Sequence, residues 1–364
     1  MNVKNLRGYL LILGLLSFSM SYCQETIRVH KEDMPKNIIL FIGDGMGLAQ
    51  IQSGLTVNYG RLNLLSFRNI GFSKTQPAFG YITDSGAGAT ALSTGVKTYN
   101  GAIGVGPDSA SLKTILEYAE QAGLSTGLVS TSAITHATPA SFIAHSNSRN
   151  DYEGIAADFL KTDIDVFIGG GRNNFTLRKD KRNLVQELRD KGYQVMFSMD
   201  SIRGVRQGKL AGLTAPDHNP SILQGRNREM LITATQTAIN LLSKNKKGFF
   251  LMVEGSEIDF GGHANNTDFV AQEVIDFDRA IGAALDYARL YQNTLIIVTA
   301  DHETGGMALT GGSFKEGKVS AKFALTDHTG VMVPVFAYGP GSRLFQGFQE
   351  NTEIFDKMKL LFGF

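Results

Sequence analysis

The chain has 364 residues, of which 43% are hydrophobic and 19% are charged, and its formal net charge is +1. This composition is typical of a globular protein with one large domain or two ordinary ones. A net charge so close to zero argues against a broad surface for nucleic acid, so any anion must be bound by a local site.

Residues 1–23 have the pattern of an export signal. Two basic residues precede an apolar run over 9–20, which lacks the polar face of an amphipathic helix and is too short to span a membrane. Cys23 is the only cysteine and lies at the expected cleavage site. We therefore predict a periplasmic or secreted protein whose mature chain, residues 24–364, has no membrane span and no disulfide. The alternative is a lipoprotein anchored through Cys23.

Six short, nearly continuous apolar runs predict strands that are covered on both faces. They cover residues 37–43, 125–131, 165–170, 248–255, 294–300 and 331–339. Helical patterns lie between them, for example over 269–289, where apolar residues recur at helical spacing. This alternation predicts an α/β fold with a single large, mostly parallel central sheet that helices cover on both faces. The more polar region 172–230 is expected to hold excursions from this sheet.

The stretch "YITDSGAGATALSTG", residues 81–95, places Ser85 before a run of small residues. This pattern predicts a helix that begins near Ser85 and that other groups can approach closely. The free N–H groups and the dipole at a helix N-terminus favour an anion. Taken alone, Ser85 is explained most simply as the residue that caps the helix.

The segment 131–149 contains a second group of polar residues. His136 and Thr138 follow a predicted strand, and Arg149 lies further along. Arginine is the natural bidentate partner of a phosphate or a carboxylate, although a solvated helix end would also explain it. His145 in the same segment is interpreted as a supporting residue.

Acidic residues follow three of the predicted strands. These residues are Asp44, then Glu254 with Asp259 soon after it, and Asp301 with His302 beside it. One such acid is usually a turn or a helix cap, but open α/β sheets bind ligands beyond the carboxyl ends of their strands. Several carboxylates in one crevice need cations to neutralise them.

Histidines in acidic or glycine-rich contexts strengthen the prediction of a metal centre. His263 follows Asp259 by four residues, so one turn can direct both side chains at one ion, and His302 and His328 lie in "ADHETGG" and "TDHTG". Aspartate and imidazole ligands together suit Zn²⁺.

The motifs "DGMG", "TDSGAGATALSTG", "THATPASF…AHSNSR", "FFLMVEGSEIDFGGHAN", "IIVTADHETGG" and "DHTG…VFAYGPGS" occur in this order. Together they resemble alkaline phosphatases, in particular the compact, cold-adapted bacterial members. The resemblance implies an exported phosphomonoesterase that forms a phosphoseryl intermediate, and it implies a homodimer. Residues 24–364 would form one catalytic domain.

The resemblance also implies a role for each residue in these motifs. Ser85 would be the nucleophile and Arg149 would hold the phosphate. Two zinc ions and one magnesium ion would be bound by three sets of ligands, namely Asp259, His263 and His328; Asp44, Asp301, His302 and Ser85; and Asp44, Thr138 and Glu254.

The sequence departs from the family pattern at four places. Gly86 stands where alanine is usual, and Phe260 stands where members carry lysine, histidine or tryptophan. His136 replaces the aspartate of some members, so the third ion could be Mg²⁺, Zn²⁺ or Co²⁺. The segment 307–326 is short, which predicts a capping region reduced to a loop. A phosphodiesterase or sulfatase, and a binding protein without activity, are the alternatives.

Overall fold

A computed structural model describes residues 33–364. The predicted export signal, with Cys23, lies outside the described residues. Among residues 33–364, no helix combines the length and apolar character needed to cross a membrane.

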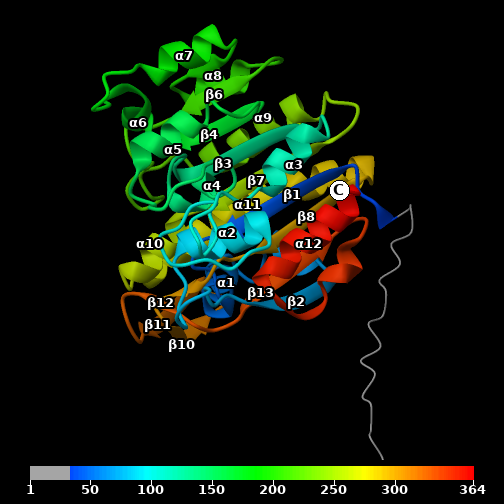
Figure 1. Ribbon diagram of the computed structural model, residues 1–364. Coiled ribbons are helices and arrows are strands. Elements are labelled where there is room, and N and C mark those ends of the chain that lie inside the picture. Colours follow the sequence, from blue (N-terminus) through cyan, green and yellow to red (C-terminus); the bar gives the residue numbers. More distant parts are fainter. Residues whose placement is uncertain (1–32) are drawn as a thin grey trace, which may run out of the picture.

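A ten-stranded sheet forms the centre of the molecule (Figure 1). Every neighbouring pair of strands is parallel except the two pairs made by β13, which is antiparallel to both β8 and β2. The strands lie side by side in the order β14 (Gly347–Glu350), β2 (Asn69–Lys74), β13 (Val333–Tyr338), β8 (Thr294–Thr299), β1 (Asn37–Gly43), β7 (Phe249–Gly255), β3 (Ser125–Ala133), β4 (Val166–Gly170), β6 (Leu210–Leu213) and β5 (Gln194–Met196).

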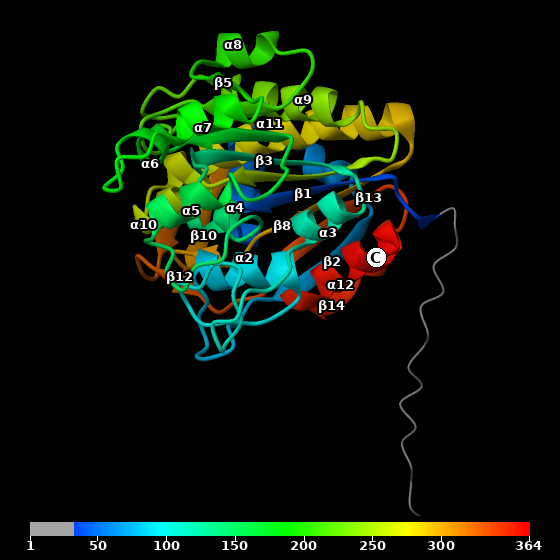
Figure 2. The same cartoon turned by 45° about the horizontal axis from the view of Figure 1, so that its top comes forward.

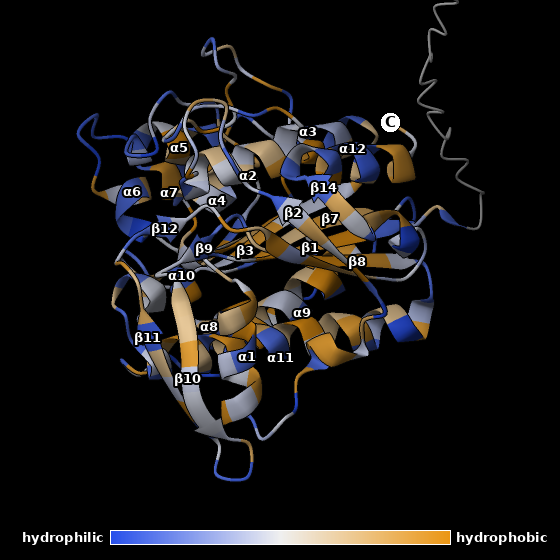
Figure 3. Ribbon diagram, turned by 90° about the horizontal axis from the view of Figure 1, so that it is seen from below, coloured by the Kyte–Doolittle hydropathy of each residue, from blue (hydrophilic) through white to orange (hydrophobic). Residues whose placement is uncertain are grey.

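Helices cover both faces of this sheet, as the continuous apolar strands predict. One face carries α1 (Leu48–Val57), α9 (Met230–Leu242) and α11 (Thr267–Tyr291), and the other carries α2 (Ser85–Thr94), α3 (Ile115–Gln121) and α12 (Asn351–Phe362) (Figure 2). Strand β1 supplies both cores, because Leu40 packs into one hydrophobic cluster and its neighbour Phe41 packs into the other. Hydrophobic residues gather on the central strands in Figure 3. The predicted fold class is confirmed.

The polar region 172–230 forms the excursion that was predicted, and it returns twice to the sheet as β5 and β6. It holds three short helices, α6 (Arg172–Thr176), α7 (Leu184–Asp190) and α8 (Met199–Gly204). The remaining short helices are α4 (Ala137–Ala140), α5 (Tyr152–Asp158) and α10 (Glu257–His263), with 3₁₀ turns at Asn63–Ser66 and Ser342–Phe345.

The segment 307–326 is not a simple loop, so that expectation was wrong. It forms an antiparallel hairpin of β10 (Met307–Ser313) and β11 (Lys318–Phe323), which packs beside α1 (Figure 3). Two further short strands flank this hairpin in the sequence, β9 (Glu303–Thr304) before it and β12 (His328–Thr329) after it. They pair with each other, antiparallel. The β9–β12 pair brings the chain after β8 beside the chain before β13.

Candidate active site

The acids predicted at strand ends lie at one edge of the sheet. Strands β8, β1 and β7 are neighbours and parallel, so their carboxyl ends meet there. Asp44 follows β1, Asp301 follows β8, and Glu254 is the penultimate residue of β7. All three side chains are buried.

Three of the predicted residues converge on the ring nitrogen of a fourth, His302. His302 Nε2 lies 3.4 Å from Asp44 Oδ1, 3.3 Å from Asp301 Oδ2 and 3.4 Å from Ser85 Oγ. Burial, followed by repulsion from Asp259, raises the pKa of Asp301 to about 6. This geometry places the Ser85 hydroxyl beside a site that attracts cations.

Ser85 is not the residue that caps α2. Asp84 is the cap, because its carboxylate accepts a hydrogen bond of 2.9 Å from the N–H of Ala87. The Ser85 hydroxyl is therefore free for chemistry. A Cβ atom added at Gly88 would lie 3.1 Å from Asp301 Cβ, so the small residues of α2 do permit close approach. At Gly86 the added atom would lie 2.9 Å from the Ala102 carbonyl oxygen, which explains why alanine does not fit here without a shift.

A second cluster joins α10 to β12. His263 Nε2 lies 3.2 Å from Asp259 Oδ2 and 3.2 Å from His328 Nε2, and His328 Nε2 lies 3.6 Å from Asp259 Oδ1. The Nδ1 atoms donate to carbonyl oxygens, that of His263 to Thr326 at 2.7 Å and that of His328 to Thr83 at 2.9 Å. With both Nδ1 atoms donating, the two Nε2 atoms face each other, and either a proton or a metal ion between them would relieve the repulsion of their lone pairs.

A third group lies around Asp44 on its other side. The ligand atoms of Asp44, His136 and Glu254 come within 4.8 Å of one another. Burial raises the pKa of Glu254 to about 7 and that of Asp44 well above its usual range. Within residues 33–364, several buried atoms at this group have no hydrogen-bond partner, namely both carboxylate oxygens of Asp44, Oε1 of Glu254, Oγ1 of Thr138 and Nδ1 of His136.

The unpartnered oxygen atoms fit metal ions. A buried acceptor without a donor is costly, and buried carboxylates that face each other need a counter-charge. Hard oxygen donors around Asp44 and Glu254 suit Mg²⁺, and the mixture of imidazole and carboxylate in the other two clusters suits Zn²⁺.

Arg149 reaches the same edge from the segment after α4. Its Nη1 donates to Asp84 Oδ2 at 2.8 Å, and its Nη2 lies 3.2 Å from His136 Nε2. Because a guanidinium can only donate, His136 must accept through Nε2. Burial and the charge of Arg149 lower the pKa of His136 to about 3, so this ring is neutral.

Residues 35–322 and 313–363 match the family model of alkaline phosphatases. The chain belongs to the alkaline phosphatase family. It is 34% identical to alkaline phosphatase 4 of Bacillus subtilis over 96% of each chain. The alkaline phosphatase of the Antarctic bacterium TAB5 is 44% identical with a TM-score of 0.85, over 91% of this chain and 98% of that chain. A cold-active alkaline phosphatase from a psychrophilic Shewanella is 34% identical with a TM-score of 0.81, over 89% of this chain and 99% of that chain.

Membership in this family makes the protein a phosphatase, and the predicted resemblance is confirmed. The roles that the resemblance implies for individual residues stay predictions, although the structure brings all of those residues to one edge of the sheet. Two solved variants of the TAB5 enzyme, in which a histidine is replaced by glutamate or aspartate, have Mg bound in a site called M3.

Two residues that line this edge in the phosphatase were not predicted from the sequence. The ring of His218 lies edge-on to the rings of His136 and Phe260, with centroids 5.2 Å and 5.4 Å apart. Thr304 donates through its hydroxyl to Asp259 and lies 3.2 Å from His302 Nδ1. His218 lies in the polar excursion, where no strand or motif marks it, whereas Thr304 stands inside "DHETGG" and could have been included.

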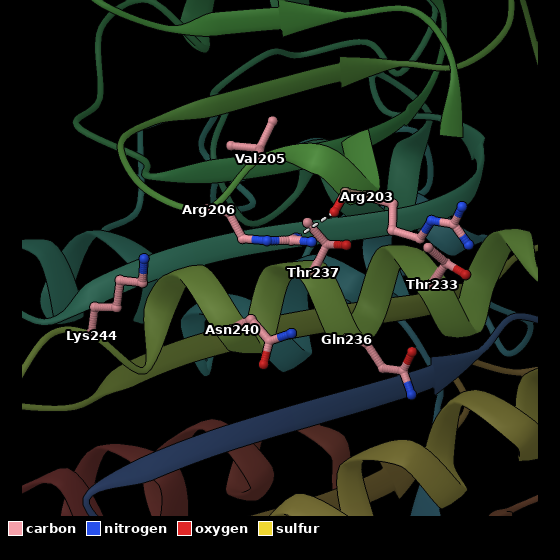
Figure 4. A pocket seen from close by; sticks show the side chains of 8 residues that line it. All are labelled: Arg203, Val205, Arg206, Thr233, Gln236, Thr237, Asn240 and Lys244. Carbon is pink, nitrogen blue, oxygen red and sulfur yellow. Dashed lines mark hydrogen bonds between the residues drawn. The ribbon is translucent and has the colours of Figure 1, made fainter. Parts of the chain in front are cut away.

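A separate pocket of about 400 Å³ lies between α8 and α9 (Figure 4). Arg203, Arg206 and Lys244 line it together with Val205 and four uncharged polar residues on α9. None of these eight side chains is an acid or a histidine, so the pocket lacks the groups that phosphoryl transfer requires.

Replacing Phe260 by lysine should tighten inhibition by inorganic phosphate about three- to tenfold. The Phe260 ring faces His136, 6.0 Å away between centroids, on the side of the site that holds Arg149, and an ammonium group there would add a charge for phosphate. The inhibition constants of both proteins measure the effect. Phe269→Lys, on a half-buried ring at the start of α11, is the matched control. Equal constants for wild type and Phe260→Lys would show that this side chain does not face bound phosphate.

Proposed function

We propose that the protein hydrolyses phosphate monoesters through a phosphoseryl intermediate on Ser85, with two Zn²⁺ ions and one Mg²⁺ ion. The observation that carries this proposal is the position of the Ser85 hydroxyl. It lies 3.4 Å from His302 Nε2, at the start of α2, and Arg149 reaches the same end of that helix through Asp84. A nucleophile, a cation-binding cluster and an arginine thus share one end of a helix, where an anion is favoured.

The ligands of each ion follow from the three clusters. Asp259, His263 and His328 would hold one Zn²⁺, and Asp44, Asp301 and His302, with Ser85, would hold the other. Asp44, Thr138 and Glu254 would hold Mg²⁺. When bound, these ions would favour the deprotonated Ser85 hydroxyl and stabilise negative charge on the attacking and leaving oxygens.

The side chains of this chain would then act as follows. Arg149, held by Asp84, donates to the phosphate oxygens and orients the phosphorus in front of Ser85. Ser85 Oγ releases its proton to water and forms a bond to phosphorus while the ester P–O bond breaks, and the departing oxygen takes up a proton from water. Water then cleaves the phosphoseryl ester, which restores the Ser85 hydroxyl and releases inorganic phosphate.

The test combines metal analysis of the purified protein with hydrolysis of three aryl esters, a phosphate monoester, a phosphate diester and a sulfate. We expect zinc and magnesium in the protein and rapid hydrolysis of the monoester alone. Faster cleavage of the diester or the sulfate would favour the two related hydrolase classes. Metal binding without any hydrolysis would indicate a binding protein on the same fold.

His136 should weaken the Mg²⁺ site, because Mg²⁺ prefers oxygen ligands and an imidazole nitrogen suits Zn²⁺ or Co²⁺ better. His136→Asp should therefore tighten Mg²⁺ binding about tenfold and make activity less sensitive to excess Zn²⁺. The TAB5 variants with a carboxylate in place of a histidine, which carry Mg, support this expectation. Activity is titrated with Mg²⁺ at fixed Zn²⁺. Superimposable titrations for the two proteins would mean that His136 does not influence that site.

We also propose that the protein is exported, that residues 24–364 form the mature catalytic domain and that two copies form a homodimer. The export pattern of residues 1–23 supports the first two statements, and family resemblance supports the third. N-terminal sequencing of the protein from the cell exterior or periplasm, and its mass in solution, test them. An acylated Cys23 at the N-terminus would identify a lipoprotein instead.

A further inference from the structure

His145 lies between two hydrogen-bond acceptors. Its Nδ1 is 2.7 Å from the carbonyl oxygen of Gly104, and its Nε2 is 3.2 Å from Glu117 Oε1 on α3. A carbonyl oxygen and an ionised carboxylate can only accept, so each contact requires an N–H on the ring. Neutral imidazole has one N–H, and therefore both contacts form only when His145 is the imidazolium.

The charged groups around His145 favour this imidazolium. Glu117 is fixed by the capping box of α3, where its Oε2 accepts from the N–H of Thr114 at 2.8 Å. Asp158 on α5 accepts from the backbone N–H of His145 at 3.0 Å, and Lys161 pairs with the other oxygen of Asp158. The hydrogen bond to Glu117 is the largest influence and raises the pKa of His145.

One of the two acceptors, Gly104, belongs to a segment that holds Arg149. The chain at 101–104 runs beside the chain at 145–149, because Ile103 and Ser146 exchange two backbone hydrogen bonds of 2.9 Å and 2.8 Å. At the far end of this pairing, the N–H of Arg149 donates to the Gly101 carbonyl oxygen at 2.7 Å. His145 closes the near end by bonding Gly104.

The same pairing extends to the start of α2. The N–H of Gly101 donates at 2.9 Å to Asp84 Oδ2, the same oxygen that accepts from Arg149 Nη1. Glu117, His145, the 101–104 segment, Asp84 and Arg149 are therefore linked by consecutive hydrogen bonds. This series of bonds connects His145 to the guanidinium although the two side chains do not touch.

We infer that His145 is a positioning residue for Arg149, and that its imidazolium fastens the Arg149 segment so that the protein binds oxyanions more tightly than when the ring is neutral. This inference rests on the proposed role of Arg149 in holding phosphate. A histidine whose pKa is raised by folding keeps its favourable contacts below about pH 6.5 and loses them as the pH rises through the raised value. Oxyanion affinity should therefore fall over that range, which would ease the release of product phosphate under alkaline conditions.

The experiment measures inhibition of the metal-loaded enzyme by tungstate, which stays dianionic from weakly acid to alkaline pH. His145→Gln is compared with wild type at each pH, because the ratio of the two inhibition constants cancels every titration that both proteins share. We expect the variant to be inhibited about five- to tenfold more weakly near pH 6, and the two proteins to be inhibited about equally at alkaline pH, once wild type has lost the proton.

Glu117→Gln gives the second readout, because it keeps the capping position but removes the charge beside His145. The pH at which wild type and His145→Gln converge should move down by about one unit when measured in the Glu117→Gln background. Glu120→Gln, one turn later on α3, is the matched control, because Glu120 accepts a hydrogen bond from Thr126 and does not contact His145. It should leave that pH unchanged.

Three outcomes separate the possibilities. A ratio that does not vary with pH, or a convergence that Glu117→Gln does not shift, would overturn the inference and assign His145 a purely structural role. If Arg149→Ala leaves tungstate inhibition unaltered, the proposed function of Arg149 fails instead. If His145→Gln lowers metal content or does not fold, the single variant Glu117→Gln is compared with wild type instead. A shift in the pH dependence of tungstate inhibition then supports the inference, and no shift overturns it.

Discussion

Replacing Ser85 by alanine should lower the turnover of an aryl phosphate by at least about a thousandfold, because Ser85 is the proposed nucleophile and the alanine methyl group cannot form a bond to phosphorus. The fold and the metal content should change little. Ser85 begins α2 without capping it, and its hydroxyl contacts only His302 among the described residues. The aspartate and histidine ligands of the neighbouring cluster stay in place.

The measurement combines steady-state kinetics with acid trapping of the phosphoenzyme, which should be found on wild type and not on Ser85→Ala. Thr94→Val is a matched control in the same helix, because its hydroxyl donates locally to the Thr90 carbonyl oxygen at 2.7 Å. This control should keep its activity. A Ser85→Ala protein with more than a tenth of wild-type turnover would remove Ser85 from the mechanism.

Removal of the metal ions should abolish activity and lower the melting temperature by roughly 5–15 °C. Asp44, Glu254, Asp259 and Asp301 are buried at one edge of the sheet, and several of their oxygens have no donor within the part of the chain that the structure describes. Without bound cations these carboxylates repel one another across a desolvated space. A chain rich in glycine and poor in proline, with 41 and 8 residues, has a high unfolded-state entropy and little reserve to offset this repulsion.

Calorimetry with and without a chelator measures this effect. Asp44→Asn provides the decisive comparison, because it removes one of the repelling charges together with a shared ligand. The metal-free variant should melt above metal-free wild type, whereas the metal-treated variant should be inactive and gain little from added zinc. A melting temperature that chelation does not change would contradict the prediction.

The central strands and their acids could be predicted because burial on both faces leaves a continuous apolar run. Strand β1 has all of its residues buried and the bounds that its pattern predicts, and helix α11 extends only two residues beyond each end of the predicted span. The strands β2, β5, β6 and β14 were missed. They are short, lie toward the edges of the sheet and mix glycine or polar residues into their sequences, so they carry no such run.

The candidate site residues that follow predicted strands could be identified from the sequence. Residues that only tertiary packing brings to the site could not. His218 reaches His136 because the loop after β6 returns along the sheet edge, where the carboxylates of Glu273 and Asp276 bind Arg226 of the same loop. No spacing in the sequence encodes that return. Similarly, the Ala102 carbonyl oxygen that leaves no room for a Cβ atom at Gly86 lies in a segment outside every predicted element.

The order of strands has a consequence for how the protein matures. Strand β1 is made first, yet it lies between β8 and β7, which begin only at Thr294 and Phe249, and the last predicted metal ligand is His328. A growing chain therefore holds Asp44 without Glu254 until β7 is made, and without Asp301 and His302 until β8 is made. Contacts between such distant segments form late in folding. Catalytic competence should arise in a single step after synthesis is nearly complete, so a prematurely terminated chain cannot become a partly active phosphatase.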